Sequence, residues 1–217
     1  ESFPSSNPVT VTPTLNPESA TPSVENTPSA AETPEKIGLS REEAEKLTKG
    51  APIGFEWSAM GISTTQIEKV GLEDNGSLAA PKGYKNVGWY AGGEQACNST
   101  GALIMDFHMS RKDGVTLVGP DFAQKVAEMG VGSIISIPID GGLVCNYQVT
   151  QQATVDKWDE QSGFPALAKK WDIWGKNKGA GPTKLTVITC AGGWNNRENT
   201  SQEATVIVAV LVGQESR

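Results

Sequence analysis

The sequence has few of the residues from which metal and nucleic-acid sites are built. It contains one histidine and three cysteines, and 18 Lys and Arg stand against 25 Asp and Glu, giving a net charge of −7. One imidazole and scattered thiols cannot supply zinc ligands at the usual spacing, so neither a metal nor any other cofactor is expected. So acidic a chain lacks the basic face that binds phosphates, which argues against a nucleic-acid partner.

Long apolar runs are also missing, and no segment predicts a membrane-spanning helix. Residues 1–36 hold 7 of the 13 prolines and are otherwise mostly Ser, Thr, Asn, Ala and Glu. Such a composition cannot bury enough apolar surface to fold and favours an extended chain, so this segment is predicted to be a disordered stalk or linker. We expect it to join a folded domain, residues 37–217, to a signal or membrane anchor that precedes Glu1.

The folded part predicts one mainly β domain. Ser40 and Glu43 fit a capping box for a short helix that ends at Gly50, and apolar spacing predicts helices over 121–129 and 164–174. The rest reads as short apolar runs separated by turn signals, which is typical of an antiparallel barrel or sandwich. These runs are residues 70–72, 86–90, 101–108, 133–139, 143–150, 184–189 and 204–212.

An odd number of cysteines leaves at least one thiol unpaired within the chain. Cys97 and Cys145 can pair in an oxidising compartment, and Cys190 is then the free thiol. The alternative is that Cys97 and Cys145 are two buried free thiols.

Three residues are candidates for chemistry. Cys190 ends the run KLTVITC and is followed by Ala-Gly-Gly, which gives access and backbone amides; the alternative is a buried structural thiol. His108 ends the run GALIMDFH, where strand alternation places Asp106 on its face; a lone histidine near a turn is otherwise a surface residue. Arg197, in the loop after Cys190, is the nearest arginine that can stabilise an oxyanion, unless it is an ordinary loop residue.

The order of these segments resembles a known family. Residues 70–93 (VGLEDNGSLAAPKGYKNVGWYAGG), 100–114 (TGALIMDFHMSRKDG) and 185–194 (LTVITCAGGW) resemble the sortases, the cysteine transpeptidases of bacterial cell surfaces, and within them class E and F. The resemblance runs from about residue 51 to 212. It implies a sortase-type closed β-barrel of about eight strands with short helices.

The resemblance also implies roles. Cys190 is the expected nucleophile and His108 its acid/base partner; Thr189 shapes the site and Trp194 lines the groove. The implied reaction cleaves the Thr-Gly bond of an LPXTG-like sorting signal through a thioacyl intermediate and transfers the acyl group to an amine of a cell-wall precursor, lipid II or similar. A monomer on the extracellular face of the bacterial membrane, tethered by an N-terminal segment, is expected.

One departure from the family's pattern bears on activity. The sortase arginine stands at the start of the last strand, where this chain has Ala204 and Thr205. Arg197 can serve only if its loop folds back; otherwise Gln202 or Asn196 is the expected donor. The alternative function is a catalytically degenerate sortase-fold domain that binds peptide without turnover.

Overall fold

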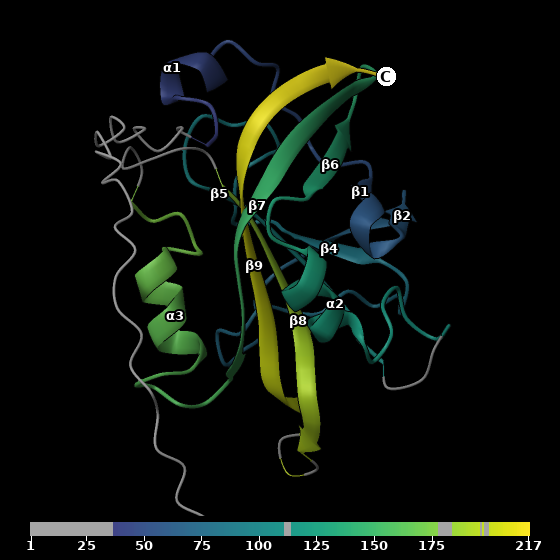
Figure 1. Ribbon diagram of the computed structural model, residues 1–217, viewed down its shortest axis with the longest axis vertical. Helices are drawn as coiled ribbons and strands as arrows, with labels where there is room; N and C mark the ends of the chain where they lie inside the picture. Colours follow the sequence, from purple (N-terminus) through teal and green to yellow (C-terminus); the bar gives the residue numbers. More distant parts are fainter. Residues whose placement is uncertain (1–36, 111–113, 178–183, 196, 198–199) are drawn as a thin grey trace, which may run out of the picture. The chain divides into compact units, whose positions relative to one another are not determined.

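The structure, a computed structural model, describes residues 37–110, 114–177, 184–195, 197 and 200–217 (Figure 1), with the side chains of residues 194 and 195 left out. The predicted stalk, residues 1–36, lies outside the described residues. The chain divides into Glu1–Glu35 and Lys36–Arg217, and the fold below belongs to the second unit. Its elements are α1 (Arg41–Ala44), β1 (Phe55–Trp57), the 3₁₀ helix η1 (Ser58–Met60), β2 (Ile62–Thr64), β3 (Ile67–Val70), β4 (Val87–Tyr90), β5 (Ala102–Phe107), α2 (Phe122–Met129), β6 (Ile134–Ile139), β7 (Leu143–Asp156), α3 (Phe164–Trp171), β8 (Lys184–Asn195) and β9 (Thr200–Ser216).

The strands form one nine-stranded sheet in the order β2-β1-β6-β7-β9-β8-β5-β4-β3. Its two edge strands, β2 and β3, are separated along the chain by only Thr65 and Gln66, so the sheet wraps round until its edges meet. A nearly closed, mainly β barrel results, which confirms the predicted fold class. The pairs β3–β4 and β5–β8 are parallel, and the other ladders are antiparallel.

Alternating residues of the central strands serve two apolar clusters. Leu185 and Val187 of β8 lie in the main core, which fills the barrel. Ile188 of β8 and Val206 and Val208 of β9 instead join a second cluster with α3. We call the side of β5, β8 and β9 that faces away from the barrel core the outer face.

The helices begin where the sequence predicts. Ser40 and Glu43 form both halves of the capping box before α1, which stops at Ala44 instead of continuing to Gly50. α2 begins at Phe122 as expected. α3 was predicted to reach Trp174 but ends at Trp171, because Asp172 adopts a left-handed conformation with φ of 48°.

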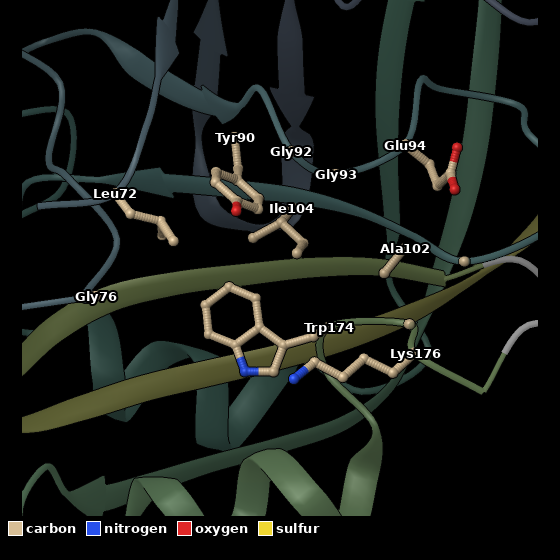
Figure 2. A pocket seen from close by; sticks show the side chains of 12 residues that line it. Leu72, Gly76, Tyr90, Gly92, Gly93, Glu94, Ala102, Ile104, Trp174 and Lys176 are labelled. Carbon is tan, nitrogen blue, oxygen red and sulfur yellow. The ribbon is translucent and has the colours of Figure 1, made fainter.

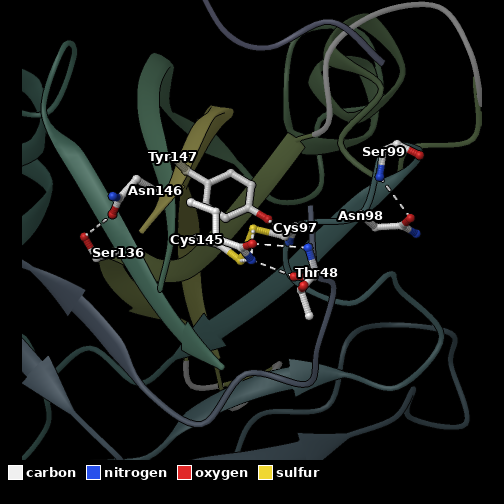
Figure 3. The surroundings of a disulfide bond; sticks show 9 residues. Thr48, Cys97, Asn98, Ser99, Ser136, Cys145, Asn146 and Tyr147 are labelled. Carbon is white, nitrogen blue, oxygen red and sulfur yellow. Dashed lines mark hydrogen bonds between the residues drawn. A yellow bond between two sulfur atoms is a disulfide. The ribbon is translucent and has the colours of Figure 1, made fainter. Parts of the chain in front are cut away.

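A disulfide joins Cys97, in the β4–β5 connection, to Cys145 on β7 (Figure 3). It is buried, and the Tyr147 hydroxyl beside it accepts a hydrogen bond of 2.9 Å from the Cys97 amide. Of the two alternatives that the sequence left open, the structure contains the bonded pair. Cys190 is the free cysteine.

Removing this disulfide is expected to lower the free energy of unfolding by about 2–4 kcal/mol, because a cross-link between residues 48 apart restricts the unfolded chain. Urea unfolding of Cys97→Ala/Cys145→Ala, in a Cys190→Ala background that prevents thiol exchange, measures the loss. The matched control is Cys190→Ala with its disulfide reduced. Its unfolding midpoint in urea should lie close to that of the variant that also carries Cys97→Ala and Cys145→Ala. A difference below about 0.5 kcal/mol between oxidised and reduced forms would contradict the prediction.

Candidate active site

The parallel pairing of β5 with β8 brings the free cysteine and the single histidine together. The ladder runs from Ala102 opposite Lys184 to Phe107 opposite Thr189. His108 and Cys190 are the next residues along the two chains, one step beyond the last pair. Residues in register on neighbouring strands point to the same face, and both follow by alternation the outer-face residues Asp106 and Ile188. The register thus directs the thiol and the imidazole to the outer face, where β5 ends beside β8.

The His108 ring is half-buried and held by its surroundings. Its Nε2 lies 2.6 Å from the backbone oxygen of Pro81, and its ring centroid is 5.4 Å from that of Tyr84. A carbonyl oxygen only accepts hydrogen bonds, so Nε2 carries the hydrogen and donates it. In the neutral ring Nδ1 is then the nitrogen that can take up a proton.

The Cys190 sulfur has a cationic partner. Lys157, directly after β7, donates from Nζ to Cys190 Sγ at 3.4 Å and to Thr200 Oγ1 at 3.0 Å. All three residues are half-buried. Within the part of the chain that the structure describes, no hydrogen bond joins the His108 ring to this sulfur, so the ammonium is the polar group in contact with it.

Asp106 occupies the outer face two residues before His108 but does not orient the imidazole. Its Oδ1 is buried without a hydrogen-bond partner among the described residues. Burial, and secondarily the nearby Glu68 carboxylate, raise the pKa of Asp106 from 3.8 to about 7. The side chain lies against Gly88 of β4, where an added Cβ would overlap it. The expected contact with His108 is replaced by the Pro81 carbonyl.

A cavity of about 480 Å³ opens on the same face toward the start of β5 (Figure 2). The side chains of Tyr90, Ile104 and Trp174 point into it, and the rings of Tyr90 and Trp174 meet edge to face at 6.2 Å. Glu94 and Lys176 add one charge of each sign to the lining. An apolar wall with a few polar groups is typical of a ligand site.

Comparison with known proteins gives relatives by structure. No protein-family model matches the chain, and no curated protein sequence matches it. A sortase A from Actinomyces oris aligns over 79% of this chain and 86% of its own, at 14% identity and a TM-score of 0.48. A lid mutant of sortase A from Corynebacterium diphtheriae aligns over 78% of this chain and 74% of its own, at 14% identity and a TM-score of 0.48. A sortase D5 transpeptidase from Clostridium perfringens aligns over 81% of this chain and 90% of its own, at 16% identity and a TM-score of 0.46. All three are sortases. At these identities the likeness concerns the fold alone.

The position at which the sequence resemblance implies an arginine holds an alanine. Ala204 of β9 pairs directly with Cys190 of β8. Arg197 lies beyond the last pair of that hairpin, Asn195 with Thr200, and is exposed. The ladder thus sets Cys190 and His108 one step beyond the last pair of β5 and β8. Arg197 follows Cys190 by seven residues, beyond the end of β8.

Thr189 was expected to shape the site and Trp194 to line its groove. Thr189 is buried, and its hydroxyl donates to the Phe107 carbonyl at 2.8 Å, so it ties β8 to β5 directly below the pair Cys190 and His108. This contact positions the two strands. Trp194 pairs through its backbone with Ser201, and its side chain lies outside the described residues.

Lys157 was not singled out from the sequence. It stands 33 residues before Cys190, directly after the end of β7. Its place near Cys190 follows from the sheet order β7-β9-β8, in which the single strand β9 separates the end of β7 from Cys190. No local pattern in the sequence carries that order.

Proposed function

We propose that this protein is a sortase-type cysteine transpeptidase, of class E or F type, with Cys190 as nucleophile and His108 as acid/base partner. The observation that supports the proposal is the parallel register of β5 and β8, whose last pair, Phe107 with Thr189, directly precedes the single imidazole and the free thiol. The substrate is an LPXTG-like sorting signal, and the acceptor is an amine of a cell-wall precursor.

The chemistry follows from the two groups. Nδ1 of His108 takes the proton of Cys190, and the thiolate attacks the threonine carbonyl carbon of the sorting signal. The S–C bond forms, the Thr-Gly C–N bond breaks, and the imidazolium gives its proton to the leaving glycine amine. An incoming amine then attacks the thioester carbon and passes a proton to the imidazole as the new C–N bond forms. The S–C bond breaks, the peptide leaves as an amide, and the imidazolium returns its proton to the Cys190 thiolate.

The distance from the cavity to His108 matches the length of a short peptide. Ile104 of β5 lines the cavity, and His108 follows it by four residues, directly after the end of β5. Four residues of extended chain span about 13 Å. We propose that the four residues before the scissile bond lie along the outer face of β5, with the first of them in the cavity beside Trp174.

The compartment is proposed from the disulfide. A buried Cys97–Cys145 bond persists in oxidising surroundings and favours the extracellular face of a bacterial membrane. In the described residues, no helix combines the length and apolar character that crossing a bilayer requires.

The test is intact mass spectrometry after incubation with a panel of LPXTG-like peptides, with and without a simple amine. We expect a thioacyl adduct on the wild type and an amide product when the amine is present. Cys190→Ala is the matched control and should form neither. Peptide binding without an adduct from any peptide would contradict the proposal and favour the degenerate binding domain, for which Ala204 at the arginine position is the supporting observation.

A further inference from the structure

Building on the proposed function, we propose that Lys157 is a catalytic residue that supplies the positive charge at the Cys190 sulfur, in place of the arginine that the sequence resemblance implies. Its ammonium first stabilises the thiolate. As the thiolate attacks, negative charge passes from sulfur to the carbonyl oxygen, and the same ammonium donates to that oxyanion.

The contacts of the ammonium carry the proposal. Lys157 Nζ lies 3.4 Å from Cys190 Sγ and 3.0 Å from Thr200 Oγ1. Within the described residues no carboxylate lies within ion-pair distance of it. The charge is therefore directed to the sulfur without being neutralised, in a half-buried site where solvent screening is weaker than on the surface.

The sheet fixes the geometry. Val155 of β7 pairs with Ala204 of β9, and Ala204 pairs with Cys190 of β8, so these three residues form one row across three strands. Lys157 follows two residues after Val155, and its amide donates to the Gln202 carbonyl at 2.9 Å. Since strands lie about 4.8 Å apart, β7 is about 10 Å from β8, a span that the lysine stem and the cysteine side chain cover together.

Alanine at position 204 is part of this arrangement. A long side chain there would stand between Lys157 and Cys190, because position 204 occupies the middle of the row. The methyl group leaves the path over β9 open. The small side chain at position 204 of β9 and the lysine that extends from the end of β7 are thus compatible with each other.

Other charged groups near the site are few. Asp156 directs its carboxylate to the amides of Trp158 and Asp159, at 2.6 and 3.0 Å. On β9, Glu203 lies against Gly192, one residue beyond Ala191 in the strand of Cys190. On the β5 side the titratable neighbours are His108 and Asp106, which precedes His108 by two residues on the same face and has Glu68 beside it.

The first experiment measures Cys190 alkylation by iodoacetamide between pH 5 and 9, by mass spectrometry. Cys190 is the free thiol, so the rate reports on it alone. Lys157→Met is expected to slow alkylation about tenfold at pH 6.5 and to move the half-maximal rate to higher pH by about one unit, as loss of a neighbouring opposite charge does. At pH 9 the rates should converge, a pattern that a merely structural role does not produce.

Matched variants separate charge from packing. Lys157→Arg should retain the wild-type profile, whereas Lys157→Gln, which keeps a donor for Thr200, should behave as Lys157→Met. Arg197→Met tests the arginine that the sequence resemblance implies. Lys169→Met removes an exposed charge of α3 and should leave the profile unchanged. Glu203→Gln is measured alongside so that its own titration is identified.

The second experiment measures thioacylation by the best sorting-signal peptide. Lys157→Met is expected to lower kcat/KM by about 10²- to 10³-fold, the usual effect of removing an oxyanion donor. If the wild type forms no thioacyl adduct, the proposed function fails, while the alkylation series still decides the role of Lys157 at the sulfur. An unchanged alkylation profile in Lys157→Met, or a larger shift in Arg197→Met, would overturn the inference.

Discussion

Replacing His108 by alanine is expected to lower kcat/KM for peptide transfer by about 10²- to 10⁴-fold, the range of general acid–base catalysis. The leaving glycine amine departs only if a proton reaches it, and His108 is the single histidine of the chain. Its Nε2–H is engaged by the Pro81 carbonyl at 2.6 Å, which leaves Nδ1 for proton transfer. The measurement is steady-state transfer of a sorting-signal peptide to an amine.

Two controls test whether the His108 ring transfers the proton. His108→Gln keeps a donor for the Pro81 carbonyl but cannot shuttle a proton, so it should be as slow as His108→Ala. Added imidazole should restore part of the activity of His108→Ala and none of that of Cys190→Ala. A loss below about tenfold in both histidine variants would show that another group moves the proton.

Asp106→Asn is expected to stabilise the protein at neutral to alkaline pH, by up to about 4 kcal/mol relative to its effect at pH 4. The pKa of Asp106 is about 7 in the folded protein, against 3.8 for the ordinary carboxyl, because burial and then Glu68 disfavour the charge. The folded state therefore holds this proton more tightly than the unfolded state does. Stability from this site is complete below pH 3.8 and is lost as the pH rises through 7, at about 1.4 kcal/mol per unit.

Urea unfolding of the wild type and Asp106→Asn between pH 4 and 8.5 measures this difference. The curves of free energy against pH should diverge steadily up to about pH 7 and run parallel above it. Asp74→Asn, which changes an exposed carboxyl, is the matched control and should follow the wild type. A constant difference across the range would mean that Asp106 is charged in the folded protein at every pH tested.

The elements that local patterns determine were predictable. The capping box at Ser40 and the seven apolar runs gave the start of α1 and most of the strands. β1 and β2, at three residues each, are too short to show a period and were missed. The run at residues 70–72 was placed late, because β3 occupies Ile67–Val70, where Ile67, Glu68, Lys69 and Val70 do not alternate clearly.

The candidate site was predictable only in part. Cys190 and His108 were found because each ends an apolar run within a segment that resembles a sortase. Their neighbours depend on which strands lie side by side, a property of the whole sheet: Lys157 reaches Cys190 across β9, and the Pro81 carbonyl reaches His108 from the β3–β4 connection. For the same reason strand alternation placed Asp106 on the outer face but could not show that its Oδ1 atom is buried without a hydrogen-bond partner among the described residues.

The central place of β9 in the sheet has a consequence for biosynthesis. β9 is the last strand of the described chain, yet it pairs with β7 on one side and β8 on the other along most of its length. Until it has left the ribosome, β7 and β8 expose unpaired backbone edges and apolar surface, a state prone to aggregation. The barrel therefore cannot close strand by strand during translation, because β7 and β8 lack their common partner until β9 is present.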